Sequence, residues 1–375
     1  MVKVVLKGFS DLTQSIFEIL TEIDYIDLIA FTDNDASKWG QLYKGVPCIS
    51  PFELRNKYVH KEFDYIVVNT IWDIKRGFDV YRELIELGIN SDDIKFLPIE
   101  FCKSDTKILE FQSFYELNYL YYLEFHLTNR CNLNCSGCSH FVPLIPRGDD
   151  LEFSNIKKDL SQLKTKVKHI NEIRIMGGEP LLSAKLMECI RYVKKLYPYT
   201  NIYVVTNGAL VLRMSDEFWD CLKDNRVCLD VSCYPPLYDY YDDIVRMLKA
   251  KGVFYRLGVV KWGMRQCLKE NGTLIHLEDV FDKCYCVNLY KGRLFTCPER
   301  AYVEYFNAFF NMRMPIDDGI DIYSDISFEE IRRKLYKPGK LCEYCNMWYM
   351  DIHDYKKFDV SGEKPDINSW YIKEL

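Results

Sequence analysis

Strand-like and helix-like segments alternate five times between residues 121 and 260, and this alternation constrains the fold more than any other feature. The strand-like segments are short, apolar and rich in β-branched and aromatic residues, as in IYVVT at 202–206 and VCLDVS at 227–232. The segments between them, such as DEFWDCLKD at 216–224, show the apolar spacing of amphipathic helices. Strands that alternate with helices form parallel sheets, so these repeats predict an α/β fold with a partial (β/α)6 TIM-like barrel.

A separate α/β unit precedes the barrel, over residues 1–115. Its strand-like segments at 2–9, 27–35 and 63–70 alternate with helices and predict a Rossmann-like parallel sheet. The stretches IAFTDNDASKWGQLYKGVPCISPFEL and FDYIVVNT resemble small Rossmann-like modules attached to sugar-modifying and polysaccharide-assembly proteins. The first turn, KGFSDL, has one glycine where the dinucleotide motif has three, while Asp33 and Asp35 lie where a ribose-binding acid would be. The module either binds a nucleotide or serves as a docking domain.

Composition indicates the compartment and excludes some partners. The N-terminal MVKVVLKGFSDLTQ has no basic segment followed by a long apolar one, and no apolar run has the roughly 18 residues of a membrane span. We therefore expect a cytoplasmic protein whose 15 cysteines are reduced, which favours metal binding or catalysis over disulfides. The net charge of −6 disfavours a nucleic-acid partner. Oligomeric state is left open.

The unusual short motifs all fall where predicted barrel strands end, the place where (β/α) barrels carry their chemistry. Cys131, Cys135 and Cys138, spaced C-x3-C-x2-C, follow the first strand. GGEP at 177–180 follows the second strand, TNG at 206–208 follows the third, and Ser232 and Cys233 end the fourth. Three thiolates can hold a metal centre and leave one coordination position open. A partial zinc site is the alternative, although zinc sites usually have paired C-x2-C spacing.

Together these motifs resemble the radical S-adenosylmethionine (SAM) superfamily, over residues 118–350. The resemblance implies that Cys131, Cys135 and Cys138 ligate three irons of a [4Fe–4S] cluster. In the family the amino and carboxylate groups of SAM chelate the fourth iron. Cleavage of SAM then yields a 5′-deoxyadenosyl radical that abstracts hydrogen from an unactivated carbon.

Further positions are carried over from the same resemblance. Gly177, Gly178 and Glu179 match the GGE segment that approaches the SAM ammonium, where glycine allows close backbone approach and the carboxylate complements the charge. By their place at strand ends, Asn207, Ser232 and Arg256 are the other expected SAM contacts. The residue before the last cysteine is usually bulky in the family and is Gly137 here, which affects the adenine side.

A second group of cysteines follows the barrel. The segment VNLYKGRLFT predicts a hairpin that turns at Lys291-Gly292. The pattern resembles the auxiliary-cluster extension of radical SAM enzymes in its short "twitch" form, which implies one further [4Fe–4S] cluster. We expect Cys297, Cys342 and Cys345 as ligands, with Cys286 or Cys284 as the fourth. A structural zinc site with four thiolates is the alternative.

Three domains are therefore expected: residues 1–115, Rossmann-like; 116–275, the radical SAM partial barrel; and 276–375, a small cysteine-rich α+β extension. The leading hypothesis is dehydrogenation or epimerisation of a sugar, aminocyclitol or sugar-nucleotide, with a flavodoxin- or ferredoxin-type electron donor. The alternatives are a maturase of ribosomal peptides and a non-catalytic iron–sulfur or zinc scaffold. Cys233 is the candidate hydrogen donor for epimerisation, Glu299 and Arg300 are further catalytic candidates, and His140 could also act near substrate.

Overall fold

The computed structural model describes residues 1–8, 17–18, 20–68, 74–96, 112–113, 118–259, 266–270, 284, 286–335, 337–346, 359–361 and 364–373. The chain divides into two compact units, residues 1–121 and 122–375. The three-domain limits expected from the sequence remain a prediction. In the described ranges, no helix is long and apolar enough to cross a membrane.

The first unit is built on a Rossmann-like sheet, as the sequence predicted. Its parallel strands have the order β4-β2-β1-β5-β6, so the chain moves outward from β1 in both directions. Short antiparallel strands flank this core on both edges. The strands are β1 (Val2–Lys7), β2 (Ile26–Thr32), β3 (Leu42–Tyr43), β4 (Val46–Ile49), β5 (Tyr65–Val68), β6 (Ile94–Phe96) and β7 (Gln112–Ser113).

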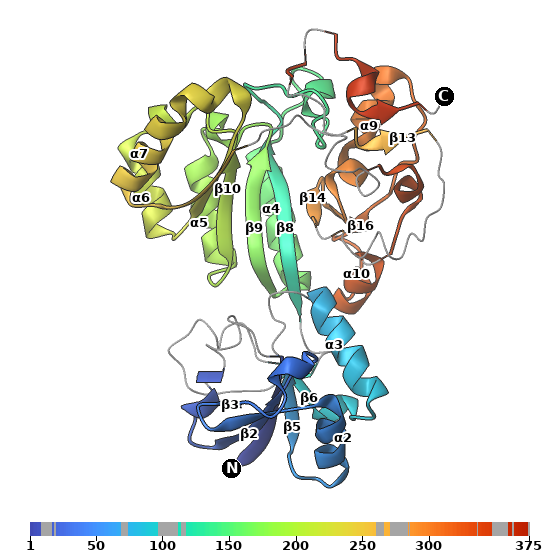
Figure 1. Cartoon of the computed structure of the whole chain (residues 1–375). Coiled ribbons are helices and arrows are strands. Elements are labelled where there is room, and N and C mark those ends of the chain that lie inside the picture. The colour runs from blue at the N-terminus through green and yellow to red at the C-terminus, as the bar shows by residue number, and fades with distance from the viewer. Residues whose placement is uncertain are drawn as a thin grey trace. The chain divides into compact units, whose positions relative to one another are not determined.

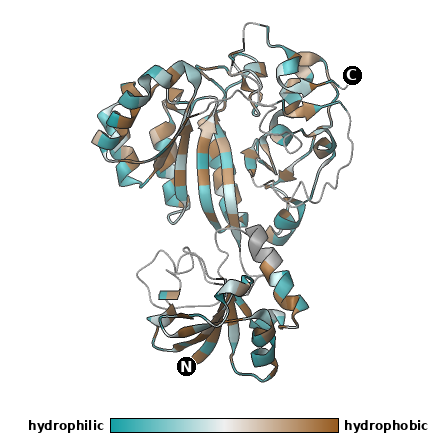
Figure 2. Cartoon of the chain, in the orientation of Figure 1, coloured by the Kyte–Doolittle hydropathy of each residue, from teal (hydrophilic) through white to brown (hydrophobic). Residues whose placement is uncertain are grey.

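Two α-helices of this unit are described, α2 (Pro51–Val59) and α3 (Ile74–Glu86). Helix α2 begins at Pro51, and the side chains of Ser50 and Glu53 form a reciprocal capping box at its N-terminus. Apolar strand residues pack on both faces of the sheet, where Val4 and Leu6 belong to one core cluster and Val5 to another. Figure 2 shows the apolar stretches along these strands.

The second unit contains the predicted βα repeats. Its sheet has the order β12-β11-β10-β9-β8-β14-β15-β16. The first five strands along the chain are β8 (Tyr119–Thr128), β9 (His169–Gly177), β10 (Asn201–Thr206), β11 (Cys228–Cys233) and β12 (Phe254–Val259). Helices follow the first four of them: α4 (Phe153–Lys166), α5 (Leu186–Leu196), α6 (Asp216–Asp224) and α7 (Tyr241–Lys251). Figure 1 shows α5, α6 and α7 gathered on one side of the strands.

Alternation along each strand gives the sheet an outer face toward the helices and an inner face. On β11, Leu229, Val231 and Cys233 are buried, while Asp230 and Ser232 are partly accessible. Val231 lies on the outer face, because a Cβ on Gly208 would meet both its side chain and that of Ile244 in α7. The inner face therefore carries Asp230 and Ser232.

A hairpin joins the far side of β8. Strand β14 (Asn288–Tyr290) pairs in parallel with β8 and antiparallel with β15 (Arg293–Phe295), which in turn pairs with β16 (Ile320–Asp321). Lys291 and Gly292 form the turn with φ of 46° and 74°, which confirms the predicted hairpin. Helices α9 (Pro298–Phe310) and α10 (Phe328–Leu335) follow, and short strands β13 (Leu268–Lys269) and β17 (Tyr371–Ile372) pair with each other.

Candidate functional site: a cysteine-lined cavity at the strand ends

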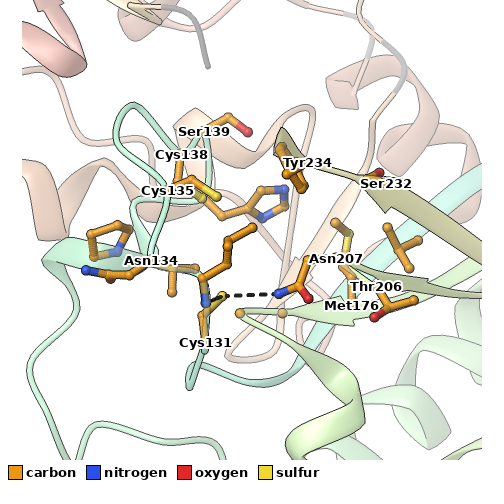
Figure 3. Close-up of a pocket in the computed structure, with 17 residues that line it drawn as sticks. Cys131, Asn134, Cys135, Cys138, Ser139, Met176, Thr206, Asn207, Ser232 and Tyr234 are labelled. Atoms are coloured by element: carbon orange, nitrogen blue, oxygen red, sulfur yellow. Dashed lines mark hydrogen bonds between the residues drawn. The ribbon is translucent and has the colours of Figure 1, made fainter. Parts of the chain in front are cut away.

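A cavity of about 240 Å³ lies at the carboxyl ends of β8, β9, β10 and β11 (Figure 3). It brings together residues from four segments that are far apart in the sequence. Seven of the residues predicted as cofactor contacts line it: Cys131, Cys135, Cys138, Gly177, Gly178, Asn207 and Ser232. Most of the cofactor contacts that were predicted from their positions at the ends of strands therefore lie at one cavity.

The three thiols lie on the loop that follows β8, and all three face the same cavity. Burial raises the pKa of the Cys138 thiol to about 11. Burial also raises the pKa of the Cys135 thiol, and its neighbours Cys138 and Cys131 raise it further by charge repulsion. Deprotonation of all three thiols here is thus disfavoured unless a positively charged centre compensates them.

Gly177 and Gly178 allow the cysteine loop to pass close to β9. A Cβ at Gly177 would lie 2.2 Å from the Thr128 carbonyl oxygen, and one at Gly178 would lie 2.2 Å from the Arg130 oxygen. Gly177 also has a φ of 148°, which favours glycine. The Gly178 N–H donates to the Thr128 carbonyl at 2.9 Å. These glycines therefore allow the start of the cysteine loop to lie against the end of β9.

Glu179 has a different environment from the one expected of a SAM contact. Its side chain is fully buried and does not line the cavity. The carboxylate accepts hydrogen bonds from the Leu181 N–H at 3.0 Å, the Thr206 hydroxyl at 2.8 Å and the Asn207 N–H at 2.8 Å. Glu179 thus joins the loops after β9 and β10, and a contact with an ammonium group stays a prediction.

Glu179→Gln is expected to destabilise the fold. The amide would point an N–H₂ group at one of the three donors and leave a buried donor unsatisfied, at a cost of about 1–3 kcal/mol. Chemical denaturation of the two proteins measures this difference. Glu188, a half-exposed carboxylate on α5, provides the control, because Glu188→Gln loses only surface ion pairs with Lys157 and Lys185. Equal stability of E179Q and wild type would contradict the structural role.

Asn207 links the third strand end to the cysteine loop. Its side-chain amide donates to Asn132 Oδ1 at 2.8 Å and lies 4.0 Å from the Cys131 sulfur, the interaction drawn in Figure 3. Its Oδ1 accepts from the Ala209 N–H at 2.9 Å. Ser232, at the end of β11, also lines the cavity, with Tyr234 beside it.

Arg256 and Cys233 do not line this cavity. Arg256 on β12 pairs in register with Asp230, two residues before the cavity-lining Ser232 on β11. Arg256 therefore lies on the inner face of the sheet, two residues further from the carboxyl ends of the strands than the cavity. Its guanidinium forms an ion pair with Asp230 and stacks on Tyr203 at 4.6 Å from the ring centroid.

Cys233 is fully buried on the outer, helix-facing side, because successive strand residues point to opposite faces. The buried, outward-facing position of Cys233 does not favour it as the hydrogen donor, and that role stays a prediction.

The second group of cysteines lies around the start of α9. Cys297 is the N-cap residue of that helix. Burial raises the pKa of Cys286, Cys297 and Cys342, and the nearby carboxylate of Glu299 raises each of them further. Cys345 lies close enough to Cys297 to raise its pKa as well. The structure also adds Cys267, which is buried within the influence of Glu299 and Cys345.

The two other catalytic candidates, Glu299 and Arg300, lie in the first turn of α9. Glu299 is buried on α9, and its pKa is raised by burial. Arg300 is engaged in structural contacts: it forms an ion pair with Asp317 and donates to the Thr296 hydroxyl at 2.7 Å. Arg300 does not line the cavity, so its expected place beside a substrate is not supported.

Buried polar residues on β8 are the main feature that sequence reasoning missed. Glu124 and His126 are almost fully buried within a strand of largely apolar residues, YLYYLEFHLT. His126 Nε2 lies 2.8 Å from Nδ1 of His140, which lines the cavity. The signal was present in the sequence, because a carboxylate and an imidazole two residues apart in a central strand share one face.

Comparison with known proteins agrees with this geometry. Residues 125–251 match the model of the radical SAM superfamily. Molybdenum cofactor biosynthesis protein 1 of Bos taurus is 35% identical over 95 residues, which cover 25% of this chain and 15% of that protein. GTP 3′,8-cyclase of Rhodopirellula baltica is 33% identical over 91 residues, covering 24% and 25% respectively. The chain thus spans a quarter or less of the length of either relative.

A solved structure, BtrN in complex with AdoMet and 2-DOIA, aligns with 60% of this chain and 93% of its own at 17% identity, with a TM-score of 0.36. The family match covers the cysteine loop, the GGE segment, and the ends of β10 and β11. Residues 125–251 of the chain therefore match a radical SAM domain.

Proposed function

We propose that Cys131, Cys135 and Cys138 hold a [4Fe–4S] cluster with SAM at its fourth iron, and that the enzyme dehydrogenates a small polyhydroxylated substrate. A sugar, an aminocyclitol and a sugar-nucleotide are the candidate classes. When bound, the cluster and SAM supply the removal of a hydrogen atom from an unactivated carbon. The protein's own residues must hold these groups, orient the substrate and move a proton.

The donor set fits such a cluster. Three thiols face one cavity, and their mutual repulsion favours a cationic centre. Among the described residues, no three His, Cys, Asp or Glu side chains are close enough to ligate a single ion. A cubane does not need that closeness, because each thiolate binds a different iron. Gly177 and Gly178 supply a wall of bare backbone against which a ligand can lie.

Polar side chains on the inner face of the sheet, next to the cavity, support the proposal of a small polar substrate. Arg174 on β9 donates to Asp230 Oδ2 at 3.1 Å, and Arg256 shares the same carboxylate. Both guanidinium groups also lie over the Tyr203 ring, Arg174 at 5.2 Å and Arg256 at 4.6 Å from its centroid. Such paired donors and acceptors beside an aromatic ring suit a ring with several hydroxyl groups.

Two observations favour dehydrogenation over epimerisation. Epimerisation needs a thiol that can return a hydrogen atom, and Cys233 faces away from the cavity. Dehydrogenation needs an electron acceptor, and the cysteines around Glu299 offer ligands for a second cluster. We propose Cys297, Cys342 and Cys345 as three of these ligands, with Cys286, Cys284 or Cys267 as candidates for the fourth.

A substrate panel tests the proposal. The anaerobically reconstituted protein is incubated with SAM, a reductant and, in turn, UDP-hexoses, UDP-aminohexoses and free aminocyclitols. The expected result is 5′-deoxyadenosine together with a product that has lost two hydrogens, detected by mass spectrometry and trapped as a carbonyl. Modification of a co-encoded peptide, with every sugar unchanged, would instead support the peptide-maturase alternative. No 5′-deoxyadenosine under any condition would support the scaffold.

A further inference from the structure

A C-terminal segment lies across the cysteine loop that follows β8. We call this segment the strap, and it comprises residues 359–361 and 364–372. The Ser361 N–H donates to the Asn134 carbonyl at 2.7 Å, and the Asn134 side chain donates back to the Ser361 carbonyl at 2.8 Å. Cys135 forms an isolated antiparallel bridge with the strap. The cysteine loop is thus paired with a segment that is distant in the sequence.

Trp370 in the strap fixes the main chain at another predicted ligand. Its side chain is fully buried, and its indole N–H donates to the Cys138 carbonyl at 2.9 Å. The same carbonyl accepts from the Phe141 N–H, also at 2.9 Å. Phe141 has a φ of 52°, which is unusual for a bulky residue and persists only where the surroundings enforce it. Two donors therefore hold the peptide group that follows Cys138 in one orientation.

The main chain of Trp370 reaches the second cysteine group. Its carbonyl accepts from the Leu268 N–H at 2.9 Å, where β13 pairs with β17. Leu268 also forms an isolated antiparallel bridge with Cys345. Beside it, the Cys267 carbonyl accepts from the Asn346 N–H at 2.9 Å. Trp370 thus binds the cysteine loop with its side chain and the strand beside the second cysteine group with its main chain.

Close packing around Trp370 keeps water away from this contact. Trp370, Phe141 and Leu268 belong to one core cluster, together with apolar residues of α9. The Phe310 ring of that helix lies 6.0 Å from the indole. Because the indole is fully buried, water does not readily take the place of its N–H. Removal of this donor leaves the Cys138 carbonyl with the Phe141 N–H alone, which is costly away from water.

We propose that Trp370 is a positioning residue of the SAM-binding cluster, and that it holds the Cys138 ligand in place from the side of the second cysteine group. This inference rests on the proposed cluster at Cys131, Cys135 and Cys138. Trp370 does not line the cavity, so it acts through the Cys138 main chain. Partners that orient metal ligands commonly change metal affinity by about tenfold to a hundredfold.

Trp370→Phe removes this hydrogen bond, and Trp219→Phe is the matched control. Trp219 on α6 is 1% exposed, and its indole nitrogen has no hydrogen-bond partner among the described residues. Both replacements delete the same atoms from a buried site, but only W370F removes a donor to the cysteine loop. Chemical denaturation measures the stability that each variant loses to the smaller ring. A difference between them in cluster binding then reports the hydrogen bond.

Chelator resistance of the reconstituted holoenzyme is the first readout. Each protein is titrated with an iron chelator while the SAM-dependent electron paramagnetic resonance signal is followed. W370F is expected to lose this signal at a chelator concentration about tenfold to a hundredfold lower than W219F. The signal of the second cysteine group is expected to be equally resistant in both variants, because the main-chain bond to Leu268 remains. Equal resistance of the SAM-dependent signal in W370F and W219F would overturn the proposal.

Hydrogen–deuterium exchange of the cluster-free protein is the second readout. The Ser136 and Phe141 amides donate to the carbonyls of Asp359 and Cys138. These amides are expected to exchange about fivefold faster or more in W370F than in W219F. Unchanged exchange would contradict the positioning role. Trp370→Tyr, which keeps more of the ring but no indole N–H, is expected to repeat both results.

The two readouts separate this inference from the proposed function. If wild type shows no SAM-dependent signal, the proposed cluster fails. Exchange in the cluster-free protein still decides whether Trp370 orders the cysteine loop.

Discussion

Replacing Cys131, Cys135 and Cys138 together by alanine is expected to remove about four irons and four sulfides per chain and to abolish 5′-deoxyadenosine formation. The three thiols line one cavity, and none forms a disulfide. With all three gone, nothing else in the cysteine loop has a comparable affinity for iron. Iron and sulfide analysis of anaerobically purified proteins measures the change.

Cys189→Ala is the matched control for this result. Cys189 is fully buried in α5, where its side chain packs as a small apolar group. Its replacement is expected to leave the iron content unchanged. The second cysteine group should retain about four irons in the triple variant. Equal iron content in the triple variant and wild type would contradict the assignment, and zinc without sulfide in wild type would replace it with a zinc site.

Gly178→Ala is expected to have the second-largest effect, because there is no room for a methyl group. Its Cβ would lie 2.2 Å from the Arg130 oxygen and 2.5 Å from the Arg130 carbonyl carbon, both of them backbone atoms. Relief of this clash must displace either the cysteine loop or the end of β9. We expect a loss of about 1–3 kcal/mol in stability and the loss of SAM binding.

Gly258→Ala separates this steric effect from a general intolerance of alanine. Gly258 lies on β12, and a Cβ there would meet no atom within 4 Å in the described part of the chain. Alanine at this position is expected to be neutral or slightly stabilising, because glycine weakens a strand. Denaturation curves and SAM titrations of both variants make the comparison. A G178A protein that binds SAM as well as G258A would contradict the close-approach argument.

Much of the fold follows from local patterns. The amphipathic spacing of 216–224 coincides with α6, and the strand-like run 202–206 lies within β10. Alternation of strands and helices then requires a parallel sheet, and parallel strands bring their carboxyl ends together. That is why residues as distant as Cys131 and Ser232 could be assigned to one cavity before their positions were known.

Side-chain direction could be predicted less well. Ser232 and Cys233 both end β11, and only the register of the sheet decides which one faces inward. The GGE motif suggested that Glu179 contacts a ligand. In the structure its carboxylate instead accepts hydrogen bonds from three nearby donors of the protein. Arg300 was chosen for its place after Cys297, but an acid 17 residues later, Asp317, pairs with it. These outcomes depend on contacts between distant segments, which a local pattern does not specify.

The most direct test of the central claim is electron paramagnetic resonance of the reduced, reconstituted protein with and without SAM. An open iron bound by SAM predicts a [4Fe–4S] signal that shifts when SAM is added and that is lost in the variant without Cys131, Cys135 and Cys138. A SAM-insensitive signal from the second cysteine group is expected in both proteins. The absence of any SAM-dependent signal in wild type, or a SAM-dependent signal that persists in this variant, would contradict a SAM-binding cluster at this cavity.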